Sequence, residues 1–502
     1  MWVDVEEATI TELQALMTSQ GLTARALVEM YVERITELDW HGPRIRSVLE
    51  INPDAFQIAE QLDAERKRSG PRGTLHGIPI LLKDNIDTAD GMMTTAGSLA
   101  LVGARPARDA FVAERLRAAG AILLGKANMS EWANFRSGHS SSGWSARGGQ
   151  GLNPYVLDRS PCGSSSGSAS AVAACMAAAS LGTETDGSIL CPGSSNGVVG
   201  IKPTLGLTSR SGVIPIAHSQ DTVGTFGRTV TDAAVVLGAI TGIDPRDPAT
   251  ESSAGRFHDD YTVFLAPDGL QNARIGVPRE VYFGYSEKAD AIAESALTTM
   301  RELGAVIVDP ANIPSAGRLK SEAREMDVLL YEFKADLNAY LAGLGPEAPV
   351  HALQDVIDFN QRHADEEMMY FGQDTFVEAQ AKGPLTDETY LEALEINRRL
   401  SRSEGIDAVM DQLQLDALVM PTAAPAFKID LINGDHFIGG CSTPAALAGY
   451  PAITVPAGFT FGLPVGVTFM GRAFSEPTLL RLAYAFEQAT RVRRSPEFLP
   501  AV

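Results

Sequence analysis

The sequence predicts an α/β fold, because short apolar runs alternate along the chain with stretches of helical periodicity. The runs are continuous rather than alternating with polar residues, which is typical of strands buried on both faces of a sheet. Strands therefore recur from near the start of the chain to near its end. They are IPILL (78–82), AILLG (121–125), VVGI (198–201), ALVMP (417–421), AITVP (452–456) and VGVTFM (465–470).

Helical patterns fill the intervals between these runs. Thr9 and Glu12 have the spacing of a capping box, so the chain is expected to open with a helix. Further helices are expected near residues 110–119, from about Ser168 in a run of small residues, and over roughly 477–491.

A long segment, about 287–404, is mostly helical in pattern, as in RLKSEAREMDVLLYEFKADLNAYL (318–341). It interrupts the strand-bearing parts, and we interpret it as a helical elaboration that shapes a pocket. Because strands occur on both sides of it, one sheet shared by a single domain over residues 1–502 is predicted.

The charge of the chain bears on its partners. Its 41 Lys and Arg against 62 Asp and Glu give a formal charge of −21, which opposes binding to nucleic acid and to anionic membranes. The uncharged run 160–183 is long enough to cross a bilayer, but it consists mainly of Ala, Ser and Gly, so no membrane span is predicted. The stretch MWVDVEEATI does not resemble a signal peptide. A cytoplasmic monomer is expected, unless a signal peptide has been removed.

Cysteine and histidine spacing indicates neither a disulfide framework nor a metal site. The four cysteines include no CxxC pair, so buried reduced thiols are expected. The eight histidines form no HExxH or other close ligand spacing. The sequence implies no metal and no cofactor. The cysteines are Cys162, Cys175, Cys191 and Cys441.

The segment CGSSSGSAS (162–170) concentrates hydroxyl groups inside the uncharged run. One interpretation is structural, a tight Gly/Ser turn whose serine caps the next helix. A phosphate-binding loop is disfavoured, because the spacing GxxxxGK[ST] is absent. A third interpretation is the G-x-S-x-G turn of an α/β-hydrolase, with Ser165 as the nucleophile. The preceding NPYVLDRSP gives poor support to the strand that such a turn must follow.

A fourth interpretation combines this segment with LHGIPILLKDNID (75–87) and LGTETDGSILCP (181–192). Together the three segments resemble the amidase signature family, which has a strand-borne lysine, a GGSSGG-like loop and a nucleophilic serine 24 residues after the loop's first serine. The family's catalytic lysine, bridging serine and nucleophile fall on Lys83, Ser164 and Ser188.

The resemblance covers nearly the whole chain and is greatest to the branch of the family that contains peptide amidases. Other matching segments are KANMSEWANFRSG (126–138) and GLPVGVTFMGRAFSEP (462–477). The loop departs from the family pattern, since Cys162-Gly163 replaces the two leading glycines and Ser166 replaces the third. The resemblance implies an α/β/α fold around a large central mixed sheet flanked by helices.

The resemblance also implies a mechanism in which Ser188 attacks the amide carbonyl and passes its proton through Ser164 to Lys83. Lysine can accept that proton only when it is neutral, and burial can lower its pKa by ~3–5 units. The uncharged surroundings of the hydroxyl cluster fit this requirement. The peptide bond between Gly163 and Ser164 is expected to be cis, also by resemblance.

Backbone amides next to the nucleophile are expected to bind the oxyanion, since Gly187 lets the backbone approach closely. A carboxylate paired with the lysine would work against the mechanism, because it would keep the lysine in its charged form. Strand alternation directs the Asp84 side chain away from Lys83, so Asp84 is expected to be structural. The same argument does not cover Asp87 and Asp186. Asp186 replaces a glycine common in the family, and selection of substrate is one role for it. The oxyanion amides are those of Thr185, Asp186, Gly187 and Ser188.

The branch resemblance implies removal of the C-terminal carboxamide from peptide amides, with release of ammonia. Aryl acylamides and simple aliphatic amides are the alternative substrates. An amidotransferase subunit that feeds ammonia to a partner, and a catalytically inactive scaffold, are the less favoured functions. Aromatic residues line an apolar cleft in one interpretation and belong to an ordinary core in the other. They are Trp132, Phe135, Trp144 and the segment 331–333.

Overall fold

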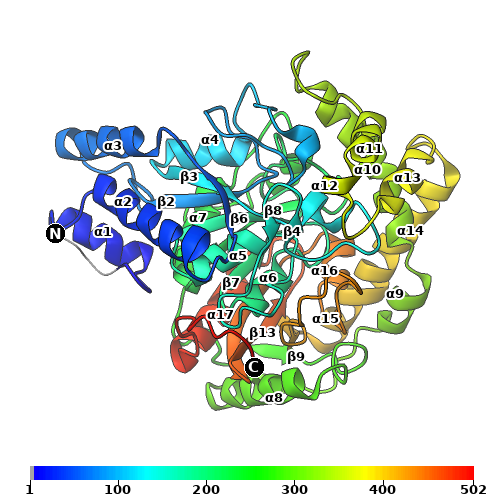
Figure 1. The fold of residues 1–502 in the computed structure, drawn as a ribbon. Coiled ribbons are helices and arrows are strands. Elements are labelled where there is room, and N and C mark those ends of the chain that lie inside the picture. Colours follow the sequence, from blue (N-terminus) through cyan, green and yellow to red (C-terminus); the bar gives the residue numbers. More distant parts are fainter. Residues whose placement is uncertain (1–4) are drawn as a thin grey trace.

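The computed structural model describes residues 5–502 and is organised around one mixed sheet of eleven strands (Figure 1). The strand order is β1-β3-β2-β6-β8-β7-β12-β13-β11-β9-β10. The sheet confirms the predicted α/β class with a large central mixed sheet. Its strands are β1 (Val48–Ile51), β2 (Pro79–Lys83), β3 (Ile122–Ala127), β6 (Ala179–Glu184), β7 (Val199–Lys202), β8 (Thr222–Gly227), β9 (Arg274–Gly276), β10 (Val306–Val308), β11 (Ala417–Pro421), β12 (Ala452–Thr460) and β13 (Leu463–Met470), while β4 (Trp144–Ser145) and β5 (Gly149–Gln150) form a separate pair.

Helices surround this sheet (Figure 1). The first begins at the capping box predicted from Thr9 and Glu12, whose side chain and backbone hydrogen bonds are both formed. The α-helices are α1 (Ile10–Thr18), α2 (Ala24–Arg34), α3 (Ala55–Ser69), α4 (Phe111–Ala118), α5 (Ser166–Ala173), α6 (Leu190–Ser195), α7 (Val230–Ile240), α8 (Glu287–Glu302), α9 (Ala316–Glu322), α10 (Glu325–Ala342), α11 (Leu353–Arg362), α12 (Ala364–Glu367), α13 (Asp374–Gln380), α14 (Glu388–Ser401), α15 (Asp407–Leu413), α16 (Thr443–Ala448) and α17 (Glu476–Thr490).

Helices cover both faces of the sheet, as two neighbouring residues of β8 show. The Thr225 hydroxyl donates a hydrogen bond to the Ala233 carbonyl of α7. Phe226, the next residue, packs with Ala169 and Val172 of α5. Since successive strand residues point to opposite faces, α5 and α7 lie on opposite sides of the sheet.

The carboxyl ends of two adjacent parallel strands, the third and fourth in the strand order, lie side by side. β2 pairs in parallel with β6, with Leu82 opposite Leu181. β2 ends at Lys83, and β6 ends at Glu184, so the side chains that follow both strands are brought to one edge. Helix α5, whose eight residues are all buried, packs beside these strands (Figure 1).

The helical pattern over residues 318–341 is interrupted in the structure. Helix α9 ends at Glu322, and Ala323 is extended with φ −62° and ψ 141° before α10 begins at Glu325. The freed amide of Arg324 donates to the side-chain oxygen of Asn397 at 2.7 Å. The hydrogen-bonding need of this amide is thus met by α14, which is distant in the sequence. Helical periodicity alone does not reveal the break.

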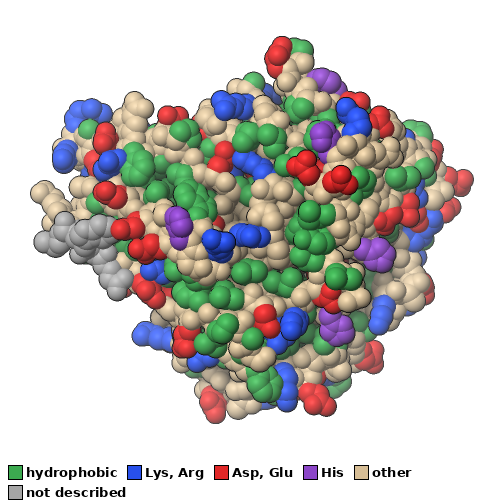
Figure 2. Space-filling view, in the orientation of Figure 1, with side chains coloured by type: hydrophobic (Ala, Val, Ile, Leu, Met, Phe, Trp, Pro, Cys, Tyr) green, Lys and Arg blue, Asp and Glu red, His purple; other side chains and the backbone are tan. Residues whose placement is uncertain are grey.

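On the face that Figure 2 shows, acidic and basic side chains are interspersed rather than gathered by sign. Within residues 5–502, no helix combines the length and apolar character that a membrane span requires. The hydroxyl-rich run 160–183 is instead almost entirely buried and comprises a loop, helix α5 and most of strand β6.

Candidate active site

Lys83, the last residue of β2, is fully buried and reaches the hydroxyl-rich loop. Its Nζ lies 2.8 Å from Ser164 Oγ, 2.8 Å from Thr183 Oγ1 and 3.2 Å from the Thr183 carbonyl oxygen. Asn85 also donates to Thr183 Oγ1, at 3.0 Å. None of the ion pairs among residues 5–502 involves Lys83. The amine is thus shielded from solvent and in contact with Ser164.

Burial lowers the pKa of Lys83 from 10.5 to about 7, because the charged amine loses its hydration. The negative charges of Asp221 and, to a smaller extent, Glu184 oppose this effect and raise the pKa. A large fraction of the amine is therefore neutral near neutral pH. Its lone pair can then accept a proton from the Ser164 hydroxyl.

Ser164 follows a cis peptide bond with Gly163, as the family resemblance implied. The carbonyl of Ser164 accepts a hydrogen bond from the Ser130 amide at 3.0 Å. A Cβ on Gly163 would clash with Ser130 Oγ, so a larger residue fits there only if the Ser130 side chain or the loop shifts. Glycine at position 163 therefore suits the close packing around Ser164.

Ser188 lies in the turn between β6 and α6 and keeps 9% of its surface exposed. The Glu184 carboxylate fixes this turn by accepting hydrogen bonds from the amides of Ile189 and Leu190, at 2.7 and 2.9 Å. The Ser188 carbonyl in turn accepts from the Ser165 amide at 3.2 Å, which joins the two serine-bearing segments. Within residues 5–502, the hydroxyls of Ser164 and Ser188 do not form a hydrogen bond with each other.

The backbone amides of Thr185, Asp186, Gly187 and Ser188 have no hydrogen-bond acceptor in the part of the chain that the structure describes. Such a run of free donors beside a serine hydroxyl is suited to bind an oxyanion. Gly187 has φ +82°, and a Cβ there would lie 2.9 Å from Ser442 Oγ. The backbone conformation at this position therefore requires glycine.

Asp221 contacts the first residue of this run of free amides. Its Oδ1 accepts a hydrogen bond from Thr185 Oγ1 at 2.5 Å, and its Oδ2 accepts from the amides of Ile216 and Ala217. Burial raises the pKa of Asp221 to about 6, although these hydrogen bonds oppose that rise. Asp221 thus holds the segment with the free amides and also supplies the main charge that favours protonated Lys83.

Asp186 faces a second carboxyl group rather than the lysine. Its Oδ2 accepts a hydrogen bond from Thr443 Oγ1 at 2.7 Å, and Glu325 is close enough for the two carboxyl groups to affect each other's charge. Gln220 donates to Glu325 at 2.8 Å. Burial, and then the charge of Asp186, raise the pKa of Glu325 to about 8, and burial also raises the pKa of Asp186. Burial and the like charges of the two carboxyls therefore disfavour the state in which both are ionised.

The other two acidic residues near Lys83 in sequence are bound elsewhere. Asp84 accepts hydrogen bonds from Thr95 and Gly97, so its side chain points away from the lysine as strand alternation predicted. Asp87 accepts from the Tyr340 hydroxyl at 2.8 Å. Sequence reasoning missed the groups that do act on Lys83, namely Thr183 and Asp221. Thr183 lies in β6, immediately before the residues 185–188 whose amides are free. This position in the sequence could have indicated that Thr183 is near the site.

The expectation of reduced thiols was wrong for two of the four cysteines. Cys162 and Cys191 form a disulfide bond, with Cα atoms 6.0 Å apart, whereas Cys175 and Cys441 are free and buried. The pair is separated by 29 positions and has no CxxC spacing, so only the approach of the loop to α6 brings the thiols together.

Ser165 has a structural role. It is fully buried, its hydroxyl donates to the Thr183 carbonyl at 3.0 Å, and it accepts from the Thr183 amide at 3.2 Å. No strand precedes the loop within residues 151–165. Both findings disfavour the α/β-hydrolase interpretation.

The aromatic residues singled out from the sequence pack with one another and with aromatic side chains of the helical segment. They are buried, and their rings lie 4.9–5.7 Å from those of their neighbours. The ordinary-core interpretation is therefore the better one. The pairs are Trp132 with Phe376, Phe135 with Phe333, and Trp144 with Tyr370.

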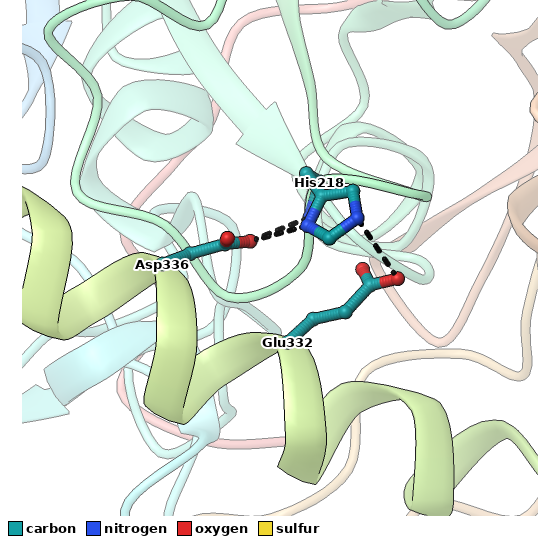
Figure 3. Close-up of side chains that lie close together, drawn as sticks. All are labelled: His218, Glu332 and Asp336. Atoms are coloured by element: carbon teal, nitrogen blue, oxygen red, sulfur yellow. Dashed lines mark hydrogen bonds and ion pairs between the residues drawn. The ribbon is translucent and has the colours of Figure 1, made fainter. Parts of the chain in front are cut away.

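A cluster with metal-ligand chemistry, His218, Glu332 and Asp336, forms an ion-paired clamp (Figure 3). Asp336 lies 2.8 Å from Nδ1 of the imidazole and Glu332 lies 3.4 Å from Nε2, so the carboxylates occupy opposite sides of the ring. Burial lowers the pKa of His218, but the hydrogen bond with Asp336 and the charges of both carboxylates raise it overall. The contacts of both ring nitrogens with carboxylates account for the position of the imidazole ring.

Comparison with known proteins shows the family to which the chain belongs. A profile of the Amidase family matches residues 26–480. The chain belongs to the amidase signature family. It is therefore an amide-hydrolysing enzyme.

Several relatives match over nearly their full length. The crystal structure of native peptide amidase from Stenotrophomonas maltophilia superposes with a TM-score of 0.94, at 52% identity and with 99% of each chain covered. A probable amidase from Arabidopsis thaliana is 44% identical over 99% of this chain and 92% of its own length. A glutamyl-tRNA(Gln) amidotransferase subunit from Chloroflexus aurantiacus is 36% identical, with 97% of each chain covered.

Proposed function

We propose that this amidase hydrolyses the C-terminal carboxamide of peptide amides to a carboxylic acid and ammonia, through a Ser188–Ser164–Lys83 relay. The observation that carries the proposal is the buried amine of Lys83, 2.8 Å from Ser164 Oγ and with a pKa lowered by burial to about 7. The 52% identity to a peptide amidase supports the substrate class.

In the acylation step, Ser188 Oγ bonds to the amide carbon while its proton passes to Ser164 and the Ser164 proton passes to Lys83 Nζ. The C–N bond then breaks, and the proton returns along the same path to the departing nitrogen, which leaves as ammonia. Water repeats the sequence on the acyl-enzyme and releases the acid. The hydroxyls of Ser164 and Ser188 are expected to come into hydrogen-bond contact when substrate is bound.

Negative charge develops on the carbonyl oxygen during both steps. The free amides of residues 185–188 are positioned to donate to it, since they have no other acceptor in the described chain. Removal of one such donor typically lowers kcat by about 10²–10³-fold in serine hydrolases. Asp221 acts through Thr185 by holding this segment in place.

The experiment is incubation of the purified enzyme with a panel of peptide amides, anilides and aliphatic amides, with ammonia, amine and acid products followed by mass spectrometry. Ammonia release from peptide amides is expected, and Ser188→Ala should abolish it. Hydrolysis of anilides alone would contradict the substrate class and indicate an aryl acylamidase. Ammonia release that requires an added protein would indicate an amidotransferase subunit instead.

A second experiment tests the nucleophile. The enzyme is labelled with a fluorophosphonate, digested, and the adduct is located by peptide mapping. We expect the adduct on Ser188, and Ser165→Ala should be labelled in the same way. An adduct on Ser165 with none on Ser188 would refute the relay.

A further inference from the structure

The disulfide between Cys162 and Cys191 connects the two segments that carry the proposed catalytic serines. Cys162 lies two residues before Ser164, and Cys191 lies three residues after Ser188 in the first turn of α6. The side chains are buried, with 5% and 8% of their surface exposed, and pack with Ala423. The bond therefore sets how far these segments can separate at the site itself.

Few other interactions join the same two segments. The Ser165 amide donates to the Ser188 carbonyl at 3.2 Å, and the Asn196 side chain donates to the Pro161 carbonyl at 2.8 Å. Ser164 and Ser188 do not hydrogen-bond to each other through their side chains within residues 5–502. The alignment of the two hydroxyls thus depends on how their backbones are held.

Opening the disulfide changes the space that these side chains need. Two thiols in van der Waals contact are farther apart than two bonded sulfurs, and the surrounding atoms leave little exposed surface to accommodate them. Burial of both side chains restricts rotation of the thiols about their Cα–Cβ bonds, so part of the separation falls on the two backbones that also carry the serines. Proton relays are sensitive to such movement, since a misplacement of about 1 Å can lower a rate on the order of 100-fold.

We propose that Cys162 and Cys191 are positioning residues for amide hydrolysis, and that reduction of their disulfide by a small dithiol lowers kcat. The inference rests on the roles proposed for Ser164 and Ser188. In the reaction, the protein disulfide gains two electrons and two protons to give two thiols, while the dithiol is oxidised to a cyclic disulfide. Oxidation of the thiols reverses the change, so the activity responds to the thiol–disulfide balance around the enzyme.

The test compares the oxidised wild-type enzyme with the same enzyme treated with dithiothreitol. Alkylation and peptide mapping measure the fraction of Cys162 and Cys191 that has become reduced, and circular dichroism at the assay temperature verifies that both forms are folded. We expect kcat to fall about tenfold or more in proportion to that fraction. KM should change by less, and reoxidation should restore kcat.

Two variants separate this effect from other actions of the reductant. The double variant Cys162→Ala/Cys191→Ala should have a low kcat that dithiothreitol no longer changes. Cys175→Ser, which removes a free buried thiol, should respond as the wild type does. Complete alkylation of Cys162 and Cys191 with kcat unchanged would overturn the inference, and so would an equal response of the double variant.

A parallel measurement distinguishes failure of this inference from failure of the proposed function. The rate at which a fluorophosphonate labels Ser188 is compared in oxidised and reduced enzyme, since this rate needs the relay but no amide. A slower rate after reduction supports the positioning role even if no peptide amide is hydrolysed. An unchanged rate contradicts it even if the oxidised enzyme is an active peptide amidase.

Discussion

Acidification should inactivate this amidase through protonation of Lys83. The pKa of the amine is lowered by burial to about 7, and only the neutral form can take the proton from Ser164. Below that pH the neutral fraction falls tenfold for each pH unit. At pH 5 it is roughly one hundredth, so kcat/KM should be about 100-fold below its plateau.

The same group should make the stability of the enzyme depend on pH. Lys83 has a pKa of 10.5 when unfolded and about 7 when folded, so the unfolded state holds one more proton between these values. Stability therefore rises with pH in this window, by up to about 1.4 kcal/mol per pH unit, because the unfolded state binds more protons. The full burial penalty, about 5 kcal/mol, applies below pH 7.

Lys83→Met provides the matched control, since methionine has similar length and no charge. The variant should lack measurable amidase activity, and its unfolding free energy should lack the rise seen in the wild type. Urea unfolding at pH 7 and pH 9 is the measurement, with the wild type expected to gain about 2 kcal/mol more than the variant. Equal gains in the two proteins, or a kcat/KM that stays level from pH 8 to pH 5, would refute a neutral buried lysine as proton acceptor.

Three further substitutions test neighbouring groups. Asp221→Asn removes the main charge that raises the pKa of Lys83, so the acid limb of the kcat/KM profile should move to lower pH; a shift to higher pH would contradict this. Thr183→Val removes a hydroxyl 2.8 Å from Lys83 Nζ and should lower kcat, whereas equal turnover would show that the contact is not needed. Arg136→Leu leaves Glu131 and Glu367 buried without their cation and should destabilise the fold by about 3–5 kcal/mol in urea unfolding, and a loss below about 1 kcal/mol would be inconsistent with that pairing.

The strands could be predicted from sequence because their signals are local, and the family resemblance pointed to the serine-bearing loop. The run IPILL predicted β2, and the 24-residue interval of the family resemblance singled out Ser164 and Ser188, of which the structure places Ser164 against Lys83. The break before α10 could not be predicted, because the group that satisfies it, Asn397, comes from another helix. The same limit applied to the disulfide, whose cysteines meet only after the loop and α6 are packed.

Sequence alone also could not show which lysine has the properties of a base. Lys126 and Lys202 are buried too, and burial lowers the pKa of each. Lys126 donates to the Ile86 carbonyl and to Thr94, and Lys202 donates to two backbone carbonyls, so within residues 5–502 neither amine is hydrogen-bonded to a serine of the loop. Lys83 differs by its contact with Ser164, and that contact depends on the packing of β2 against the loop.

The His218 clamp connects the helical segment, through residues 216–221, to the turn that carries Ser188. Helix α10 supplies both carboxylates of the clamp and also Glu325, which binds Gln220, while Asp221 in the same short loop holds Thr185. An exchange of α10 between two amidases would consequently disturb turnover unless residues 216–221 were transplanted with it. For protein engineering, the helix and this loop constitute one interchangeable module.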